Sequence, residues 1–171
     1  PEGSTEVLPL DLANLKSVQG FADEFTRRHD RLDVLLNNAG VTFIPHERTV
    51  DGFERQFGTN HLGHFALTGR LFGRLASTPG ARVVTVTSPA ERGGTMDFDD
   101  LMYDRGGYAT MRAYGRSKLA TCCSPTNCIA GSRRRTWTRS RSPRIRAWRQ
   151  RTWVAGWKRN GTDGSFRLST A

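Results

Sequence analysis

The stretch Ala81-Arg82-Val83-Val84-Thr85-Val86-Thr87-Ser88 is the clearest strand in the sequence, because β-branched residues dominate it. A shorter apolar run, Val34-Leu35-Leu36, leads into Asn37-Asn38-Ala39-Gly40. An unbroken apolar run that stops at a glycine is typical of a strand buried on both faces. Both predicted strands therefore end in polar residues, Asn37 in one and Ser88 in the other.

Helical spacing marks the segments around these strands. The first helix has apolar residues at helical intervals: Leu15, Val18, Ala22 and Phe25. A long helix is predicted from about Thr49 to Ala76, with Pro79-Gly80 as its stop, and another from about Tyr114. Strands that alternate with helices predict an α/β fold with a parallel sheet, which binds ligands at the carboxyl ends of its strands.

Tyr114 and Lys118 are one helical turn apart and can reach the same substrate. A free tyrosine has a pKa of about 10, but a nearby cation favours its phenolate form. With the Ser88 hydroxyl at a strand end, this set could bind a carbonyl oxygen and move a proton as hydride reaches the carbon. Taken singly, the Tyr-Lys pair is more often a solvated helix face, and a serine that ends a strand is more often a turn residue.

Composition changes near residue 120. Residues 1–120 hold 14 Lys or Arg and 15 Asp or Glu, whereas residues 121–171 hold 12 Lys or Arg and only Asp163. All four tryptophans also follow residue 120, and so do all three cysteines, which are Cys122, Cys123 and Cys128. Three cysteines support no disulfide framework, so we expect a reducing, cytoplasmic setting. The apolar runs are too short to predict a membrane span.

The order of motifs resembles the short-chain dehydrogenase/reductase family over nearly all of residues 5–120. The matching elements are Asp11, Asn37-Asn38-Ala39-Gly40, Asn60-His61-Leu62-Gly63-His64-Phe65, Ser88, and Tyr114 to Lys118. Within the family, Asp97-Phe98-Asp99-Asp100-Leu101 and the long gap from Ser88 to Tyr114 look like the retinol dehydrogenase-like and WW-domain-oxidoreductase-like branch. The resemblance implies a partial Rossmann-like, doubly wound parallel sheet.

The resemblance also implies roles for these residues. Tyr114 would be the general acid/base, and Lys118 would assist it and bind the nicotinamide ribose. Ser88 would polarise the carbonyl, and Asn60 would hold a water through a local distortion of its helix. Asp11 would lie near the adenine ring, and residues 37–40, that is Asn37, Asn38, Ala39 and Gly40, would line the cofactor pocket. The implied cofactor is NAD or NADP, the implied partner is a small carbonyl or alcohol substrate, and a homo-oligomer of the full-length form is left open.

The chain departs from the family pattern at both ends. The family's glycine-rich turn, which also carries the NAD or NADP preference, would precede Pro1, so we expect the chain alone to be inactive. From Thr121 onward, moving the frame back one nucleotide restores family-like residues, including a His-Pro-Gly turn. We therefore expect a partial domain at 1–120 and a basic, disordered, out-of-frame tail at 121–171. The alternative functions are nucleic-acid binding through this Arg- and Trp-rich tail, and a non-catalytic Rossmann scaffold.

The histidines His61 and His64 have the spacing of metal ligands on a helix. No third ligand is evident, and we interpret them as packing residues.

Overall fold

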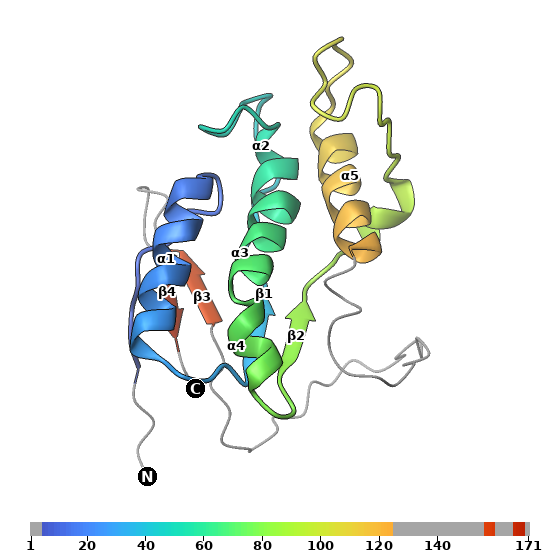
Figure 1. Ribbon diagram of the computed structural model, residues 1–171. Coiled ribbons are helices and arrows are strands. Elements are labelled where there is room, and N and C mark those ends of the chain that lie inside the picture. Colours follow the sequence, from blue (N-terminus) through green and yellow to red (C-terminus); the bar gives the residue numbers. More distant parts are fainter. Residues whose placement is uncertain (1–4, 125–155, 160–165, 170–171) are drawn as a thin grey trace.

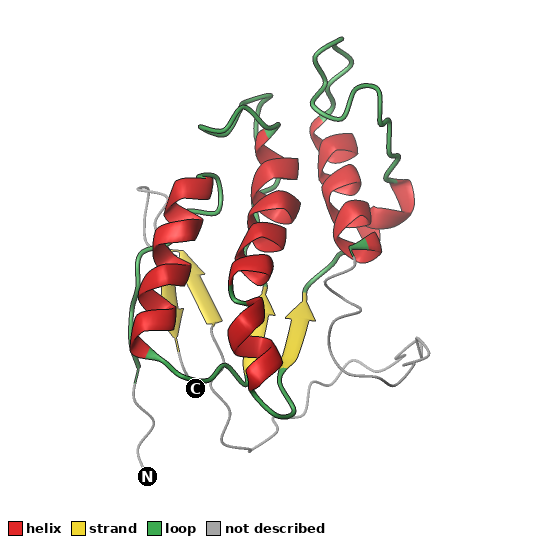
Figure 2. Ribbon diagram, in the orientation of Figure 1, coloured by secondary structure: helices red, strands yellow, loops and turns green. Residues whose placement is uncertain are grey.

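The computed structural model describes residues 5–124, 156–159 and 166–169. Helices and strands alternate through the first of these ranges, as Figures 1 and 2 show. The first half contains α1 (Leu15–Arg28), β1 (Val34–Asn37), α2 (Arg55–Phe57), the π-helix η1 (Gly58–Gly63), α3 (His64–Arg70) and α4 (Phe72–Ser77). After these come β2 (Arg82–Thr85), the 3-10 helix η2 (Pro89–Gly93), α5 (Thr110–Cys123), β3 (Gly156–Arg159) and β4 (Phe166–Ser169).

The strands β1 and β2 pair in parallel, which confirms the predicted α/β fold. Val34 lies opposite Arg82 and Asn37 lies opposite Thr85, so both strands end at the same edge of the sheet. The helices α2 to α4 form the crossover between them. The second strand is shorter than predicted, because β2 ends at Thr85, so Thr85 lies opposite Asn37 and Ser88 follows in the next segment.

The hydrophobic core lies between this sheet and the helices α1, α3 and α4. Leu35 is 4% exposed, and Val83 packs against the same cluster, whereas Val84 on the opposite face of β2 is 44% exposed. Figure 1 shows α1 and α3 side by side across the sheet. The other buried apolar side chains of this cluster come from the segment before α1, from the helices and the break between α3 and α4, and from the segments on either side of β1: Leu8, Leu10, Leu12, Val18, Phe21, Ala22, Leu32, Ala39, Leu67, Leu71 and Leu75.

The helix α1 confirms the first predicted helix. The side chain of Asn14 caps it by accepting hydrogen bonds from the backbone N–H groups of Lys16 and Ser17. Val18, Phe21 and Ala22 form its buried face. Local spacing and a good N-cap thus agree with the tertiary packing of this helix.

The prediction of one long helix from Thr49 was wrong in two respects. Its first residues are not helical, and the helix is interrupted further on. Residues 49–54 form a turn, in which Gly52 has a φ of +85°, and Val50 is 76% exposed. Helix begins only after Glu54, whose buried carboxylate accepts from the N–H groups of Gln56 and Phe57. The chain then changes to a π-helix at Gly58 and breaks again at Leu71 between α3 and α4.

The predicted boundary after Ala120 falls inside α5, which continues to Cys123 with Thr121 buried. Within the range predicted as disordered, β3 and β4 pair antiparallel, and residues 125–155, 160–165 and 170–171 lie outside the described residues. In the described part of the chain, no helix is long and apolar enough to cross a membrane.

Candidate active site

Asn60 holds three segments together at the centre of the candidate site. It lies in the π-helix η1, which is the local helix distortion that the family resemblance implied there. Its Oδ1 accepts from the backbone N–H of Val41 at 2.8 Å, and its Nδ2 donates to Val41 O at 2.9 Å and to Ser117 Oγ at 3.0 Å. The side chain is 2% exposed, so these bonds form away from water and fix η1 against the turn after β1 and against α5.

The helix α5 carries Tyr114 and Lys118 at the carboxyl ends of the strands. Lys118 is 5% exposed, and its Nζ donates to Val86 O at 3.0 Å, just beyond β2. Burial lowers the pKa of the Lys118 ammonium below its ordinary value. The same nitrogen lies 5.8 Å from the centre of the half-buried Tyr114 ring. The predicted pair is therefore on one face, with the cation directed at the tyrosine.

Gly40 allows the turn after β1 to approach both helices. A Cβ at this position would lie 3.0 Å from Asn60 Oδ1 and 3.9 Å from Lys118 Nζ. Asn38 is exposed and Ala39 is buried. The buried Asn37 side chain instead points to α3, where its Nδ2 donates to Thr68 Oγ1 at 3.0 Å. Of residues 37–40, Gly40 is thus the residue in closest contact with Asn60 and Lys118.

Ser88 follows β2, and its side chain makes one weak hydrogen bond. Its Oγ accepts from the backbone N–H of Ala90 at 3.3 Å and caps η2, and no hydrogen bond joins it to Tyr114 within residues 5–124. The packing of η2 on α5 nevertheless brings its segment close to Tyr114, because a Cβ at Gly115 would lie 2.8 Å from Ala90 O. Ser88 is half-buried beside α5.

Asp11 lies apart from the hydrogen bonds that join Asn60, Ser117 and Lys118. Its carboxylate is exposed and accepts from the N–H of Ala13 at 2.8 Å, and its own N–H donates to Ser17 Oγ at 2.9 Å. Its neighbour Leu12 packs against Gly63, so the segment still touches the end of η1.

Similarity to known proteins shows the family of the chain. Residues 2–99 match the family described as short chain dehydrogenase. The chain belongs to this family.

Individual dehydrogenases of this family confirm the retinol dehydrogenase-like resemblance. Human retinol dehydrogenase 13 is 49% identical over 111 residues, which are 65% of this chain and 34% of that protein. Mouse retinol dehydrogenase 14 is 48% identical over 119 residues, 70% of this chain and 35% of that protein. Zebrafish polyprenol dehydrogenase is 46% identical over 123 residues, 70% of this chain and 38% of that protein. The chain thus spans about a third of the length of these relatives.

A solved structure supports the fold. A crystal structure of an uncharacterised protein from Mycobacterium paratuberculosis superposes with a TM-score of 0.58 at 47% identity, covering 66% of this chain and 39% of that one. The parallel pair β1 and β2 and their crossover helices are therefore part of a Rossmann-type dehydrogenase fold.

Two α5 residues of this dehydrogenase chain were missed by sequence reasoning. Ser117 Oγ donates to Tyr114 O at 2.8 Å while it accepts from Asn60. Arg116, 4% exposed, lies 4.0 Å from the centre of the Tyr103 ring and donates to the carbonyls of Thr95, Asp100 and Leu101. The position of Ser117 next to Lys118 was the sequence signal for Ser117, but only the fold brings the loop to Arg116.

The two histidines of the motif differ in burial. His64 is 6% exposed, and its Nδ1 lies 3.1 Å from Asn60 O. Burial is the main cause that lowers its pKa to about 4, and it also lowers the pKa of the half-buried His61. Residues 5–124 contain no group of three side chains placed to hold a metal ion. His64 packs inside the fold, as its interpretation as a packing residue predicted.

Proposed function

We propose that this chain carries the catalytic part of an NAD(P)-dependent oxidoreductase that interconverts an alcohol and a carbonyl compound. The observation that carries the proposal is the buried Lys118 ammonium, held between Val86 O and the Tyr114 ring beside Asn60. A buried cation directed at a phenol is more specific than the Tyr-x-x-x-Lys spacing alone, since a solvated helix face would leave the lysine in water.

In the proposed reaction, the proton moves at Tyr114 Oη. During carbonyl reduction, Tyr114 donates this proton to the substrate oxygen, and during alcohol oxidation it accepts one. The positive charge of Lys118 favours the phenolate that remains, and the Ser88 hydroxyl donates to the same substrate oxygen. Asn60 positions α5 through Ser117, whose hydroxyl is bonded to Tyr114 O. The water that the family resemblance assigns to Asn60 belongs to the same proposal.

The residues present fit a nicotinamide cofactor. A Cβ at Gly40 would occupy space between Asn60 Oδ1 and Lys118 Nζ, and within the described residues the Lys118 ammonium donates only to Val86 O, with one of its three N–H groups. The remaining donors suit a ribose hydroxyl, and the turn 37–40 would line the pocket. When bound, the dinucleotide supplies or accepts the hydride. Asp11 is proposed at the adenine end, away from Tyr114.

The substrate class follows from the relatives. Retinol dehydrogenase and polyprenol dehydrogenase are named for isoprenoid alcohols, so we propose a lipophilic alcohol or its carbonyl form as the substrate. Retinal is therefore the first compound to assay.

A hybrid protein tests the proposed function. The corresponding segment of human retinol dehydrogenase 13 would be replaced by residues 5–120 of this chain, which include Asn60, Ser88, Tyr114 and Lys118. We expect NAD(P)H-dependent reduction of retinal, and a fall in kcat of about 10²-fold to 10⁴-fold in Tyr114→Phe, because general acid/base catalysis contributes that much. Ser77→Ala is the control, because Ser77 is exposed at the end of α4 and precedes β2, so it does not lie at the carboxyl end of that strand. Turnover in Tyr114→Phe near that of the parent would remove Tyr114 from the mechanism.

We also propose that residues 1–120 form the dehydrogenase unit and that residues 121–171 are translated out of frame. The charge difference between the two ranges supports this division. Resequencing the source DNA across codons 110–130 tests it, because an extra nucleotide near codon 121 would restore the family pattern. An unchanged sequence would contradict the frameshift. No comparison supports the alternative of a nucleic-acid-binding tail.

A further inference from the structure

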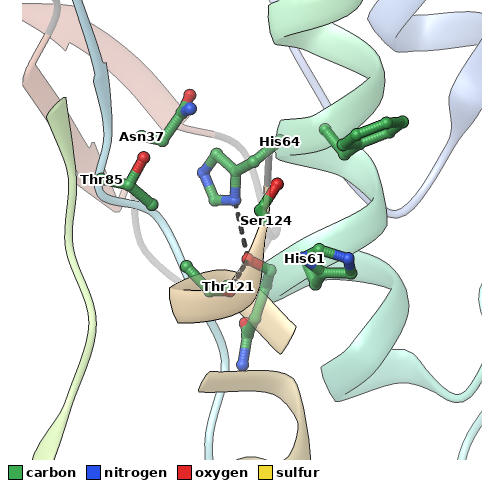
Figure 3. A pocket seen from close by; sticks show the side chains of 8 residues that line it. Asn37, His61, His64, Thr85, Thr121 and Ser124 are labelled. Atoms are coloured by element: carbon green, nitrogen blue, oxygen red, sulfur yellow. Dashed lines mark hydrogen bonds between the residues drawn. The ribbon is translucent and has the colours of Figure 1, made fainter. Parts of the chain in front are cut away.

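A small polar pocket lies between the carboxyl ends of β1 and β2 and the start of α3. Its volume is about 10 Å³, and Asn37, Thr85 and His64 line it together with Thr121 and Ser124. Figure 3 shows Asn37 and Thr85 on the strand side, facing the His64 ring. This volume is about what one water molecule needs.

His64 presents a hydrogen-bond acceptor to the pocket. Its Nδ1 is 3.1 Å from Asn60 O, and a carbonyl oxygen only accepts, so the proton of the neutral ring is on Nδ1. The lowered pKa of about 4 means that His64 carries no second proton at neutral pH. The other ring nitrogen, Nε2, is therefore an unprotonated acceptor. It is buried and has no hydrogen-bond partner among the described residues.

Asn37 presents a second acceptor. Thr68 Oγ1 donates its only proton to His64 O at 2.8 Å, so it must accept from the Asn37 amide, 3.0 Å away. This requirement assigns the Thr68-facing atom as Nδ2 and leaves Oδ1 as the other amide atom. Asn37 Oδ1 is buried without a hydrogen-bond partner in the described part of the chain.

Thr85 completes the set with a hydroxyl. Its Oγ1 is buried and has no hydrogen-bond partner within the described ranges. Two acceptors cannot bond to each other, and one hydroxyl has a single proton for two of them. A buried acceptor left without a donor costs about 1 to 3 kcal/mol. Because Thr85 Oγ1 bonds neither acceptor directly in the described part of the chain, a ligand with two donors satisfies both.

We propose that this pocket binds one water molecule, which donates to His64 Nε2 and Asn37 Oδ1 and accepts from Thr85 Oγ1. All three atoms are then satisfied, which is the usual number of bonds for a buried water. The water joins the ends of both strands to α3. Because Nδ1 of His64 bonds Asn60 O, the water also holds the ring that contacts the Asn60 backbone. His64 is in this sense a positioning residue.

Nuclear magnetic resonance of the full chain with 15N-labelled histidine tests the proposal without a variant. Long-range 1H–15N spectra at pH 7 should show His64 neutral, with the proton on Nδ1 and with Nε2 shifted as a hydrogen-bonded acceptor. Cross-peaks from the His64 ring protons to a long-lived water should accompany this pattern. A proton on Nε2, a doubly protonated ring, or a dry ring environment would each overturn the proposal.

Variants separate the water from a direct bond between Thr85 and His64. His64→Gln assigns the resonances by removing them, and His61→Gln should leave them in place. In Thr85→Ser and in Thr85→Val, the Nε2 resonance should keep its hydrogen-bonded position, because the water is its donor. If it moves to the position of a free nitrogen in Thr85→Val but not in Thr85→Ser, the hydroxyl itself is the donor and the water site is refuted.

Discussion

Two regions hold their site residues in different ways: the contact between η1 and α5, and the segment that contains Ser88 after β2. Asn60 makes three side-chain hydrogen bonds and Lys118 is bonded to Val86 O, all away from water. The side chain of Ser88 makes one hydrogen bond, at 3.3 Å, within its own turn. The side chains of Asn60 and Lys118 therefore belong to the scaffold and to the candidate site at once, whereas the Ser88 side chain contributes little to the scaffold.

Asn60→Ala should produce the largest loss of stability. It leaves the N–H and C=O of Val41 and the hydroxyl of Ser117 without their partner, so we expect the free energy of unfolding to fall by about 4 kcal/mol. Urea denaturation of the full chain measures this. Asn38→Ala is the matched control, since Asn38 is exposed, and it should change stability by less than about 0.5 kcal/mol. Equal effects of the two changes would show that the η1–α5 contact is not rigid.

Lowering the pH should lower the free energy of unfolding, because His64 in the same region is buried in its neutral form. Its pKa is about 4 in the folded chain against an ordinary value of 6.5, so the unfolded chain binds more protons between these values. The free energy of unfolding should fall by about 3 kcal/mol as pH falls from 6.5 through 4. Denaturation at several pH values measures the slope. His64→Gln should remove most of it and His61→Gln only a smaller part; a slope retained in His64→Gln would assign it elsewhere.

Gly63→Ala should have an intermediate effect, because its Cβ would overlap the backbone carbonyl of Leu12 at the end of η1. We expect a loss of about 2 kcal/mol by overpacking. Gly69→Ala is the control on α3, where nothing lies within 4 Å, and it should stabilise the chain by about 0.5 to 1 kcal/mol. Thermal denaturation of both variants decides whether η1 is tightly packed against the segment before α1.

Ser88→Ala should change stability least, by about 0.5 kcal/mol, because only one weak capping bond is lost. In the hybrid enzyme, however, kcat should fall by about 10²-fold to 10³-fold, as on removal of one donor to a developing oxyanion. Measuring both quantities sharpens the contrast with Asn60. A large loss of stability would mean that Ser88 supports the fold, and an unchanged kcat would remove it from the site.

The accuracy of the sequence predictions differed between elements for physical reasons. The strands β1 and β2 and the helix α1 were predicted correctly because burial imposes a clear local pattern on them. The helix start was misplaced because Val50 and Phe53 fit a helical spacing. The helix begins instead where the buried Glu54 carboxylate caps it, and the burial of this carboxylate depends on the tertiary fold. The break at Leu71 has no local signal in the sequence.

By itself, the sequence determined the α/β class, the strand end that carries Asn37, and the Tyr114–Lys118 pair on one helix face. These properties depend on periodicity and spacing, which are local along the chain. Only the tertiary structure decided that Lys118 is buried against Val86 O, that Ser117 joins Asn60 to Tyr114, and that Asn37, Thr85 and His64 share one pocket. Those contacts join residues far apart in the sequence, and they exist because packing the helices on the sheet removes polar groups from water and requires each to find a partner.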